Sequence, residues 1–209
     1  MPPPYADAGT RTRTVADDRG GCGAWCVSMA GDGTGSGDGE GMNSADLLTD
    51  AFTRVRETVH SAVEGLSRAD LHARLDEDAN SIGWLVWHLT RVQDDHVSDA
   101  AGVEQVWFAE DWASRFDLPF AKEATGYGHS SADVASVRVG SALLLGYHDA
   151  VHERTLAFVR GLDDGALDRI VDEAWSPPVT LGVRLISVIS DDLQHAGQAA
   201  FVRGALERR

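Results

Sequence analysis

Histidine and carboxylate side chains at helical spacing are the residues of this sequence that could do chemistry. Asp191 and His195 are four residues apart in a stretch with helical periodicity, so their side chains lie one turn apart on one face. His88 stands in the apolar segment WLVWHL of another predicted helix. Two imidazoles and one carboxylate from two facing helices would form a three-ligand metal site with open coordination positions for water or a substrate atom.

Each of these residues also has a purely structural interpretation. A histidine on an apolar helix face is commonly a hydrogen-bonded core residue, and His88 could be one. Asp192 points well inside the apolar arc of the helix that carries Asp191, and a carboxylate there must be paired or bind an ion. The spacing therefore leaves open whether Asp191 or Asp192 would be the ligand.

Other histidines compete with this set. His148 and His152 are also four residues apart and form, by spacing alone, the better two-histidine motif. Their charged neighbours in YHDAVHER predict an exposed face, which favours surface histidines. His96 follows two aspartates and is predicted to lie at a solvated helix end.

The helices that must position these side chains have clear amphipathic periodicity. The predicted helices cover residues 44–65, 80–102, 130–161 and 181–206, and capping residues mark the start of the last three. Residues 103–129 are aromatic-rich without a regular period, and we expect a long connection there, of a kind that usually carries function. Pro177 and Pro178 indicate an extended or turn segment before Thr180 caps the last helix. The sequence therefore predicts an all-α four-helix bundle, a fold that commonly builds metal sites from facing helices.

The charge balance argues against nucleic acids and membranes as partners. The 209 residues include 33 acidic and 18 basic side chains, a formal charge of −15, and Lys122 is the only lysine. Such a field repels phosphate backbones and anionic headgroups. No apolar run approaches the roughly 18 to 20 residues that cross a bilayer, and a signal-peptide pattern is absent, so we expect a cytoplasmic protein. Glycine-rich phosphate loops and nucleophile elbows are also absent.

Residues 1–42 differ in composition from the rest of the chain. They are rich in glycine, proline, serine, threonine and aspartate and lack apolar periodicity, so we predict a disordered tail before a bundle domain over residues 43–209. Translation could start at Met42, or the tail could be a real but unstructured extension. Cys22 and Cys26, the only cysteines, lack the paired spacing of a zinc site.

The segments NSIGWLVWHL and DDLQHAGQAAFVRG resemble the DinB superfamily of metal-binding four-helix bundles, over residues 44–209. The segment WLVWHLTRVQDDHV is similar to the bacterial branch of mycothiol-dependent, or related low-molecular-weight-thiol, S-transferases. The family's metal site takes one histidine from the second helix and a His-x-x-x-His pair from the fourth. His88 and His195 match this pattern, and a Gly-Gln pair follows as expected. Asp191 replaces the first histidine of the pair, where the related mycothiol-dependent maleylpyruvate isomerases place a carboxylate.

The resemblance implies a divalent metal held by His88, Asp191 and His195, with Zn²⁺ as the first choice and Ni²⁺, Fe²⁺ or Mn²⁺ also suited to such ligands. The implied reaction joins a mycothiol-like thiol to an electrophilic small molecule. Arg91 would anchor the polar co-substrate, or equally would be a surface ion-pair residue. A metal-dependent isomerase or hydrolase, and a non-enzymatic binding or dimerising bundle, are the alternatives. A homodimer through a helical face would be ordinary for this fold.

Overall fold

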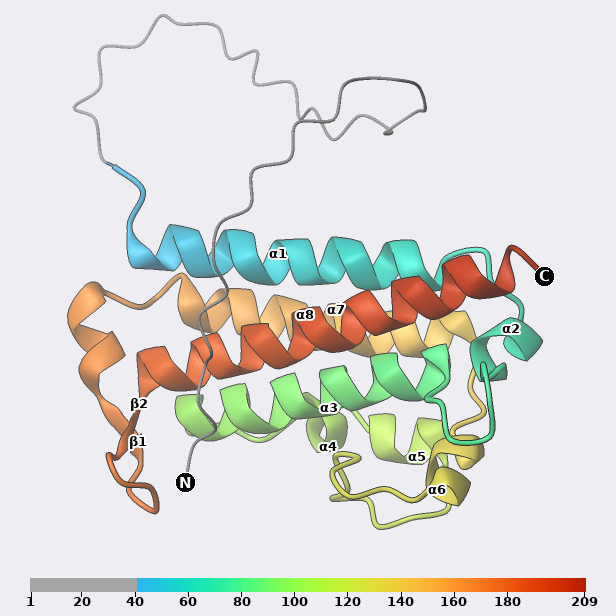
Figure 1. Cartoon of the computed structure of the whole chain (residues 1–209). Coiled ribbons are helices and arrows are strands. Elements are labelled where there is room, and N and C mark those ends of the chain that lie inside the picture. Colours follow the sequence, from blue (N-terminus) through green and yellow to red (C-terminus); the bar gives the residue numbers. More distant parts are fainter. Residues whose placement is uncertain (1–40) are drawn as a thin grey trace, which may run out of the picture. The chain divides into compact units, whose positions relative to one another are not determined.

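The computed structural model describes residues 41–209, which form a bundle of four long helices (Figure 1). These helices are α1 (Ser44–Val63), α3 (Ile82–Ala101), α7 (Ser141–Val159) and α8 (Leu181–Leu206). The predicted all-α bundle is confirmed, while the predicted tail lies outside the described residues except for its last two. Within residues 41–209, no helix combines the length and apolar character needed to span a membrane.

Capping residues define both ends of α3 and the start of α8 at the predicted places. The Ser81 hydroxyl accepts a hydrogen bond from the Trp84 N–H at the start of α3 (3.2 Å), and Gly102, with a φ of 68°, closes that helix. The Thr180 hydroxyl accepts from the Val183 N–H at the start of α8 (3.3 Å). These bonds satisfy main-chain groups that have no partner within the helix, and so they fix where each helix begins.

The third predicted helix is in fact two helices. The short helix α6 (Ser131–Ser136) is separated from α7 by an extended stretch in which Val137 and Val139 are both buried. The alternation of buried β-branched residues with polar ones is typical of extended chain rather than helix. Gly140 then forms the N-cap of α7. The prediction of one continuous helix is therefore wrong, because burial of these valines overrides the local helical pattern.

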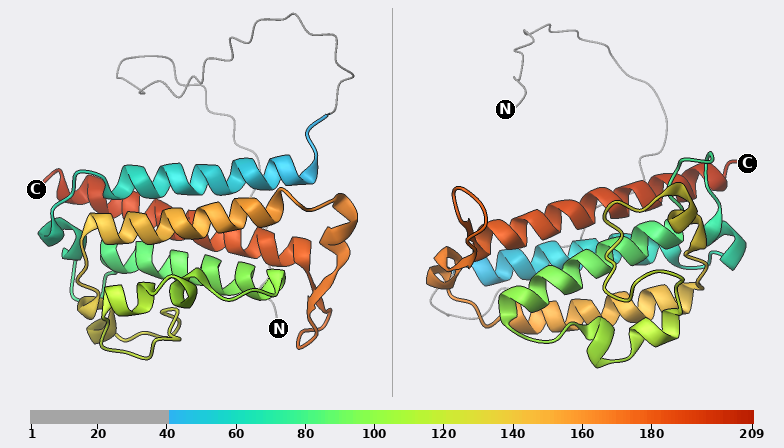
Figure 2. Two further views of the ribbon diagram at one scale, coloured as in Figure 1. Left: turned by 180° about the vertical axis from the view of Figure 1, so that it is seen from behind. Right: turned by 90° about the horizontal axis from the view of Figure 1, so that it is seen from below.

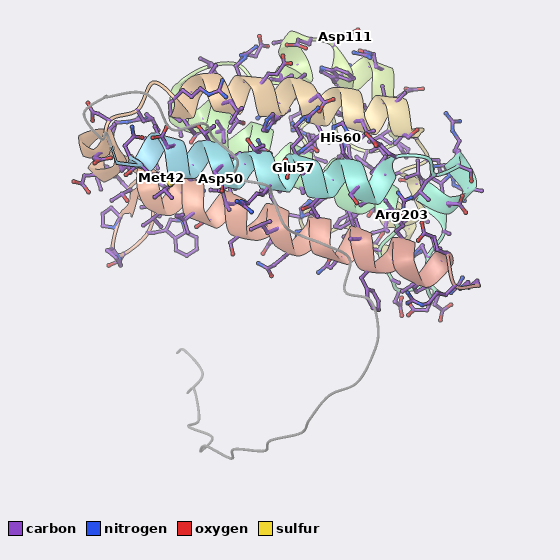
Figure 3. All side chains as sticks on the ribbon, turned by 90° about the horizontal axis from the view of Figure 1, so that it is seen from above. Met42, Asp50, Glu57, His60, Asp111 and Arg203 are labelled. Atoms are coloured by element: carbon purple, nitrogen blue, oxygen red, sulfur yellow. The ribbon has the colours of Figure 1, made fainter. Side chains whose placement is uncertain are left out.

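The long helices pack in a square in which α1 and α3 are each flanked by α7 and α8. Seen from above, α1 lies between α7 and α8 (Figure 3). Because α3 and α7 run in the same direction, the chain between them must return along the whole bundle (Figures 1 and 2). We call residues 102–140 the crossover segment. Its part 103–129 was predicted as irregular but contains two short helices, α4 (Val106–Ala109) and α5 (Trp112–Phe116).

The remaining elements are short and connect the bundle helices. They are α2 (Arg68–His72), a 3₁₀ helix (Asp164–Asp168) and the antiparallel strands β1 (Ile170–Asp172) and β2 (Val179–Thr180). The two strands form the predicted extended segment before α8.

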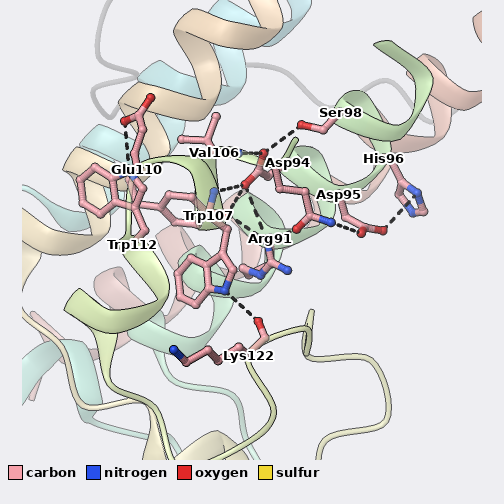
Figure 4. Close-up of polar contacts among 12 residues, drawn as sticks. Arg91, Asp94, Asp95, His96, Ser98, Val106, Trp107, Glu110, Trp112 and Lys122 are labelled. Atoms are coloured by element: carbon pink, nitrogen blue, oxygen red, sulfur yellow. Dashed lines mark hydrogen bonds and ion pairs between the residues drawn. The ribbon is translucent and has the colours of Figure 1, made fainter. Parts of the chain in front are cut away.

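A buried polar network attaches the crossover segment to α3 (Figure 4). The carboxylate of Asp94 accepts hydrogen bonds from the N–H groups of Val106 (2.9 Å) and Trp107 (2.8 Å) and so caps α4. It also accepts from the Tyr147 hydroxyl of α7 (2.8 Å) and lies 3.7 Å from Arg91 Nη1. These contacts fix the crossover segment against the helix that carries the candidate metal-binding histidine.

Candidate metal centre

Side chains from α3 and α8 meet at one point of the bundle. His88, Asp191 and His195 offer nitrogen and oxygen atoms that all lie within 4.8 Å of one another. The two imidazole centroids are 4.7 Å apart. The structure thus brings together the three residues that were expected as ligands, which we call the metal-binding set. Elsewhere in residues 41–209, no other group of three histidine, cysteine or carboxylate side chains converges in this way.

Hydrogen bonds to main-chain carbonyls orient both histidines of the set. The Nδ1 of His88 donates to the carbonyl of Thr125 at 2.5 Å, and the Nδ1 of His195 donates to the carbonyl of Asp191 at 2.9 Å. Each bond places the ring proton on Nδ1, so Nε2 keeps its lone pair. Both rings are therefore prepared to bind a cation through Nε2.

The crossover segment packs directly against His88. Gly126 has a φ of 102°, and a Cβ at this position would lie 2.6 Å from His88 Nδ1. Trp84 stacks on the same imidazole, with ring centroids 4.7 Å apart and planes inclined by 17°. Glycine at position 126 permits both the backbone conformation and the close approach of the Thr125 carbonyl. The crossover segment therefore determines how this ring is oriented.

Burial and charge keep the set suited to a cation. Burial lowers the pKa of His88, which favours the neutral ring that a metal requires. Burial alone would raise the pKa of Asp191, but the contact with His195 and the nearby His88 and His96 together hold that pKa below its ordinary value. The side chain of Asp191, 3.5 Å from His195 Nδ1, raises the pKa of His195. A proton therefore competes with a metal for His195.

The donor atoms fit a divalent metal. The Oδ2 atom of Asp191 is buried and, apart from the 3.5 Å contact with His195 Nδ1, has no hydrogen-bond partner among the described residues, a state that a bound cation would relieve. Two nitrogen donors and one oxygen donor leave further coordination positions open. Zn²⁺, Fe²⁺, Ni²⁺ and Mn²⁺ all accept such ligands.

Comparisons with known proteins agree with this geometry. The model of the family described as Mycothiol-S-transferase matches residues 47–208. The chain belongs to this family. The family is part of the DinB-like superfamily that the sequence resembles. A search of curated proteins found no match. Among solved structures, a conserved protein from Enterococcus faecalis is similar, with 27% identity over 78% of this chain and 96% of that chain and a TM-score of 0.73.

Asp192, the alternative ligand, is not part of the set in this member of the mycothiol S-transferase family. Its side chain is 0% exposed, and in the part of the chain that the structure describes neither carboxylate oxygen has a hydrogen-bond partner. Burial, with the neighbouring charge of Asp191, raises its pKa well above the ordinary value. The predicted inward position is correct, but the expected partner of this carboxyl is absent among the described residues.

Arg91 lies in the core of this family member rather than at its surface. It is 0% exposed, so its interpretation as a surface ion-pair residue is wrong. Its Nη1 donates to Gln105 Oε1 (2.8 Å), its Nε donates to the carbonyl of Ala124 (3.3 Å), and its guanidinium lies 4.8 Å from the Trp107 ring centroid. Arg91 thus binds the start and the middle of the crossover segment. A contact with a co-substrate would need this guanidinium to become accessible.

His148 and His152 are buried, at 1% and 7% exposure, so the prediction that they lie at the surface is wrong. The reason is that charged neighbours in the sequence occupy other faces of α7. Asp149, for example, pairs with Arg56 of α1 at 2.7 Å. His148 Nδ1 instead lies 3.2 Å from the hydroxyl of Thr90. Burial lowers the pKa values of His148 and His152 to about 3 and about 4, so both rings are neutral.

His96 is a residue of the site that the sequence prediction missed. It is partly buried within α3 rather than at a solvated helix end. Together with His88 and Asp191 it lines a pocket of about 350 Å³, whose other lining residues are Val92, Asp95, Thr125 and Tyr127. His96 follows His88 by eight residues, about two helical turns, and this spacing was the available signal.

Proposed function

We propose that this protein is a metal-dependent S-transferase that joins a low-molecular-weight thiol such as mycothiol to an electrophilic small molecule. The observation that carries the proposal is the meeting of His88, Asp191 and His195 beside a pocket, in a member of the mycothiol S-transferase family. These side chains would hold a divalent ion, and Zn²⁺ is the first choice. When bound, the ion would supply a Lewis acid that favours the thiolate form of a thiol.

The chain's own residues position the reactants. The carbonyls of Thr125 and Asp191 fix the two imidazoles, and the pocket walls hold the thiol and the electrophile beside the set. In a substitution, the sulfur–carbon bond forms, the bond to the leaving group breaks with its electron pair, and the thiol proton passes to solvent. The described residues contain no cysteine, which agrees with a sulfur supplied by the small molecule.

The first experiment combines elemental analysis with a thiol-dependence assay. Wild type, His88→Ala and His195→Ala are compared, with His72→Ala as the control, since His72 is a partly buried histidine on α2 that bonds the Val139 carbonyl. We expect about one metal ion per chain in wild type and control and none in the two ligand variants. Conjugation of monochlorobimane should require both the metal and mycothiol.

Other outcomes would select the alternatives. Metal-dependent turnover that persists without any thiol would indicate an isomerase or hydrolase acting through water. A wild type that binds no metal, even after incubation with Zn²⁺ or Ni²⁺, would indicate a non-enzymatic bundle.

A homodimer and a cytoplasmic location complete the proposal. Reduced thiols are maintained in the cytoplasm, which suits a thiol-dependent reaction. Light scattering on the protein as it elutes from a size-exclusion column should give the mass of two chains. The mass of one chain would contradict the dimer and leave the proposed reaction unaffected.

A further inference from the structure

A pocket beside the metal-binding set adjoins a second pocket. The first, of about 350 Å³, is lined by His88 and Asp191. The second, of about 400 Å³, lies between α3 and the start of the crossover segment. Asp95 and His96 line both pockets. Their sizes are in the range of small-molecule sites, roughly 300–1,000 Å³.

Contacts with α8 fix the ring of His96. Arg184 Nη1 lies 3.2 Å from His96 Nδ1. A guanidinium only donates, so Nδ1 must accept and the ring proton must be on Nε2. Asp172 holds Arg184 in turn, at 2.8 Å. Burial, with the charge of Arg184, lowers the pKa of His96, in agreement with a neutral ring. His96, which lines both pockets, therefore carries its one N–H donor on Nε2.

Carboxylates line a large part of the second pocket and a smaller part of the first. The second pocket is lined by Asp95, Asp99 and Glu104. Within residues 41–209, no lysine or arginine lines either pocket. The nearby guanidinium of Arg184 is already paired with Asp172. An anionic group entering the second pocket would meet these like charges, and the divalent ion proposed for the metal-binding set would lie at the first pocket instead, so entry of the anion costs free energy. Hydroxyl and amide groups, in contrast, can donate hydrogen bonds to the same carboxylates.

We propose that the two pockets bind the uncharged, hydroxyl- or amide-bearing body of the thiol co-substrate, with His96 Nε2–H donating a hydrogen bond to it and the carboxylate wall excluding anionic thiols. The inference rests on the proposed function, because it places the sulfur at the metal-binding set. His88 marks the end of the first pocket at which the metal and the sulfur would bind. It is only 7% exposed, it lines this pocket, and its Nε2 has no hydrogen-bond partner among the described residues.

A pair of matched thiols tests the charge selectivity. N-acetylcysteine amide and N-acetylcysteine differ by one carboxylate, and each can be titrated into Co²⁺-loaded protein while the visible spectrum is followed, without turnover. We expect the amide to bind wild type about tenfold more tightly than the acid. In Asp99→Asn/Glu104→Gln this preference should fall to roughly threefold or less, because two of the repelling charges are removed. Comparing the two proteins cancels the intrinsic difference between the thiols.

The control carries the same change of charge on a distant surface. Asp50→Asn/Glu57→Gln removes two exposed carboxylates from the outer face of α1 (Figure 3) and should leave the preference unchanged. An equal shift in both double variants would show that net charge, rather than the pocket wall, sets the preference, and would overturn the inference.

Variants of His96 test the hydrogen bond. His96→Leu removes the donor and should weaken mycothiol binding about tenfold, whereas His96→Gln keeps an N–H donor and should weaken it less than threefold. Metal content and the midpoint of unfolding should be similar in His96→Gln and wild type. If His96 had only a structural role, His96→Gln would instead change the metal content and the midpoint of unfolding. The His96 variants would then weaken the binding of N-acetylcysteine and its amide by the same factor as the binding of mycothiol.

Failure of the inference and failure of the proposed function are distinguishable. If no thiol changes the cobalt spectrum of wild type, the proposed function is wrong, and the inference with it. If thiols bind but the acid binds as well as the amide, or the preference persists in Asp99→Asn/Glu104→Gln, only the inference is overturned. If His96→Leu fails to fold, His96→Gln and the charge variants still test the inference.

Discussion

Asp191 and Asp192 are consecutive residues of α8 that meet opposite environments. Successive side chains on a helix point about 100° apart, so one carboxylate faces the two histidines and the other faces the core. The pKa of Asp191 is held below its ordinary value, and burial raises that of Asp192 well above it. Asp191 is therefore a ligand candidate in its charged form, whereas burial strongly disfavours the charged form of Asp192 and so costs stability.

Single substitutions should separate these two roles. We expect Asp191→Asn to weaken metal binding by at least about tenfold and Asp192→Asn to retain it. Asp192→Asn should also stabilise the metal-free protein at pH 7 by roughly 1–3 kcal/mol, since the unfolded chain no longer gains by ionising this acid. Chelator competition and urea unfolding measure the two effects. Metal loss in Asp192→Asn alone would make Asp192 the ligand.

The pH dependence of metal binding follows from His195. Its pKa is raised above the ordinary 6.5 by Asp191, and the metal must displace that proton. Metal affinity should therefore begin to fall at a pH above 6.5 and then decrease by about tenfold per pH unit. Chelator competition between pH 8 and pH 5.5 measures the curve. An affinity that stays constant down to pH 6 would contradict a role of His195 as ligand.

At the scale of elements, the crossover segment completes the metal-binding set although it supplies none of its three side chains. Asp94 and Arg91 attach this segment to α3, and the carbonyl of Thr125 fixes His88. Hydrogen bonds to the outer nitrogen of a metal-binding histidine commonly affect metal affinity 10–100-fold. The length of this connection therefore has a function besides reversing the direction of the chain.

Two glycines of the crossover segment provide a matched test of this coupling. Gly126 and Gly128 both have positive φ, at 102° and 73°, but only a Cβ at 126 would collide with His88. Both Gly126→Ala and Gly128→Ala should lose stability through backbone strain. Only Gly126→Ala should also weaken metal binding, by about 10–100-fold, as judged by chelator competition. Equal metal affinity in the two variants would show that the segment does not orient His88.

At the scale of the whole molecule, the buried histidines of α7 link stability to pH. The folded pKa values of His148 and His152, about 3 and about 4, lie below the ordinary 6.5 of the unfolded chain. Below pH 6.5 the unfolded state therefore binds protons that the folded state does not. The stability that these neutral rings contribute is complete above pH 6.5 and is lost progressively as the pH falls towards the folded values.

Replacement of one ring should reduce this dependence. Each buried neutral histidine should lower the free energy of unfolding by about 1.4 kcal/mol per pH unit below its unfolded pKa. His148→Gln should show a slope smaller by that amount in urea unfolding of metal-free protein between pH 6.5 and pH 4.5. The raised pKa of Asp192 makes the free energy of unfolding change with pH in the opposite direction. Because wild type and variant both contain Asp192, its contribution cancels in the comparison. Parallel curves for variant and wild type would contradict a buried neutral His148.

The division of the chain at residue 42 remains a prediction with a direct test. A protein that begins at residue 43 should retain the metal stoichiometry and the unfolding midpoint of the full chain. A lower midpoint would show that residues 1–42 contribute to the fold, and the predicted domain boundary would then be wrong.

The sequence by itself determined the features that depend on neighbouring residues. Amphipathic periodicity and local caps predicted α1, α3 and α8, and the four-residue spacing placed Asp191 and His195 on one face, because these patterns involve contacts within a few residues. His88 joined this pair only through the assumption of facing helices and through the family resemblance. The resemblance to the mycothiol S-transferase family could be recognised from two short segments of the sequence.

Only the tertiary structure decided which polar residues are buried and what they contact. Arg91, His148 and His96 were each assigned from their sequence neighbours, and each has a different environment because packing of α1, α7, α8 and the crossover segment decides exposure. The break between α6 and α7 has the same cause, since the buried valines gain more from the core than from another helical turn. Burial is a property of the assembled bundle, and local sequence cannot specify it.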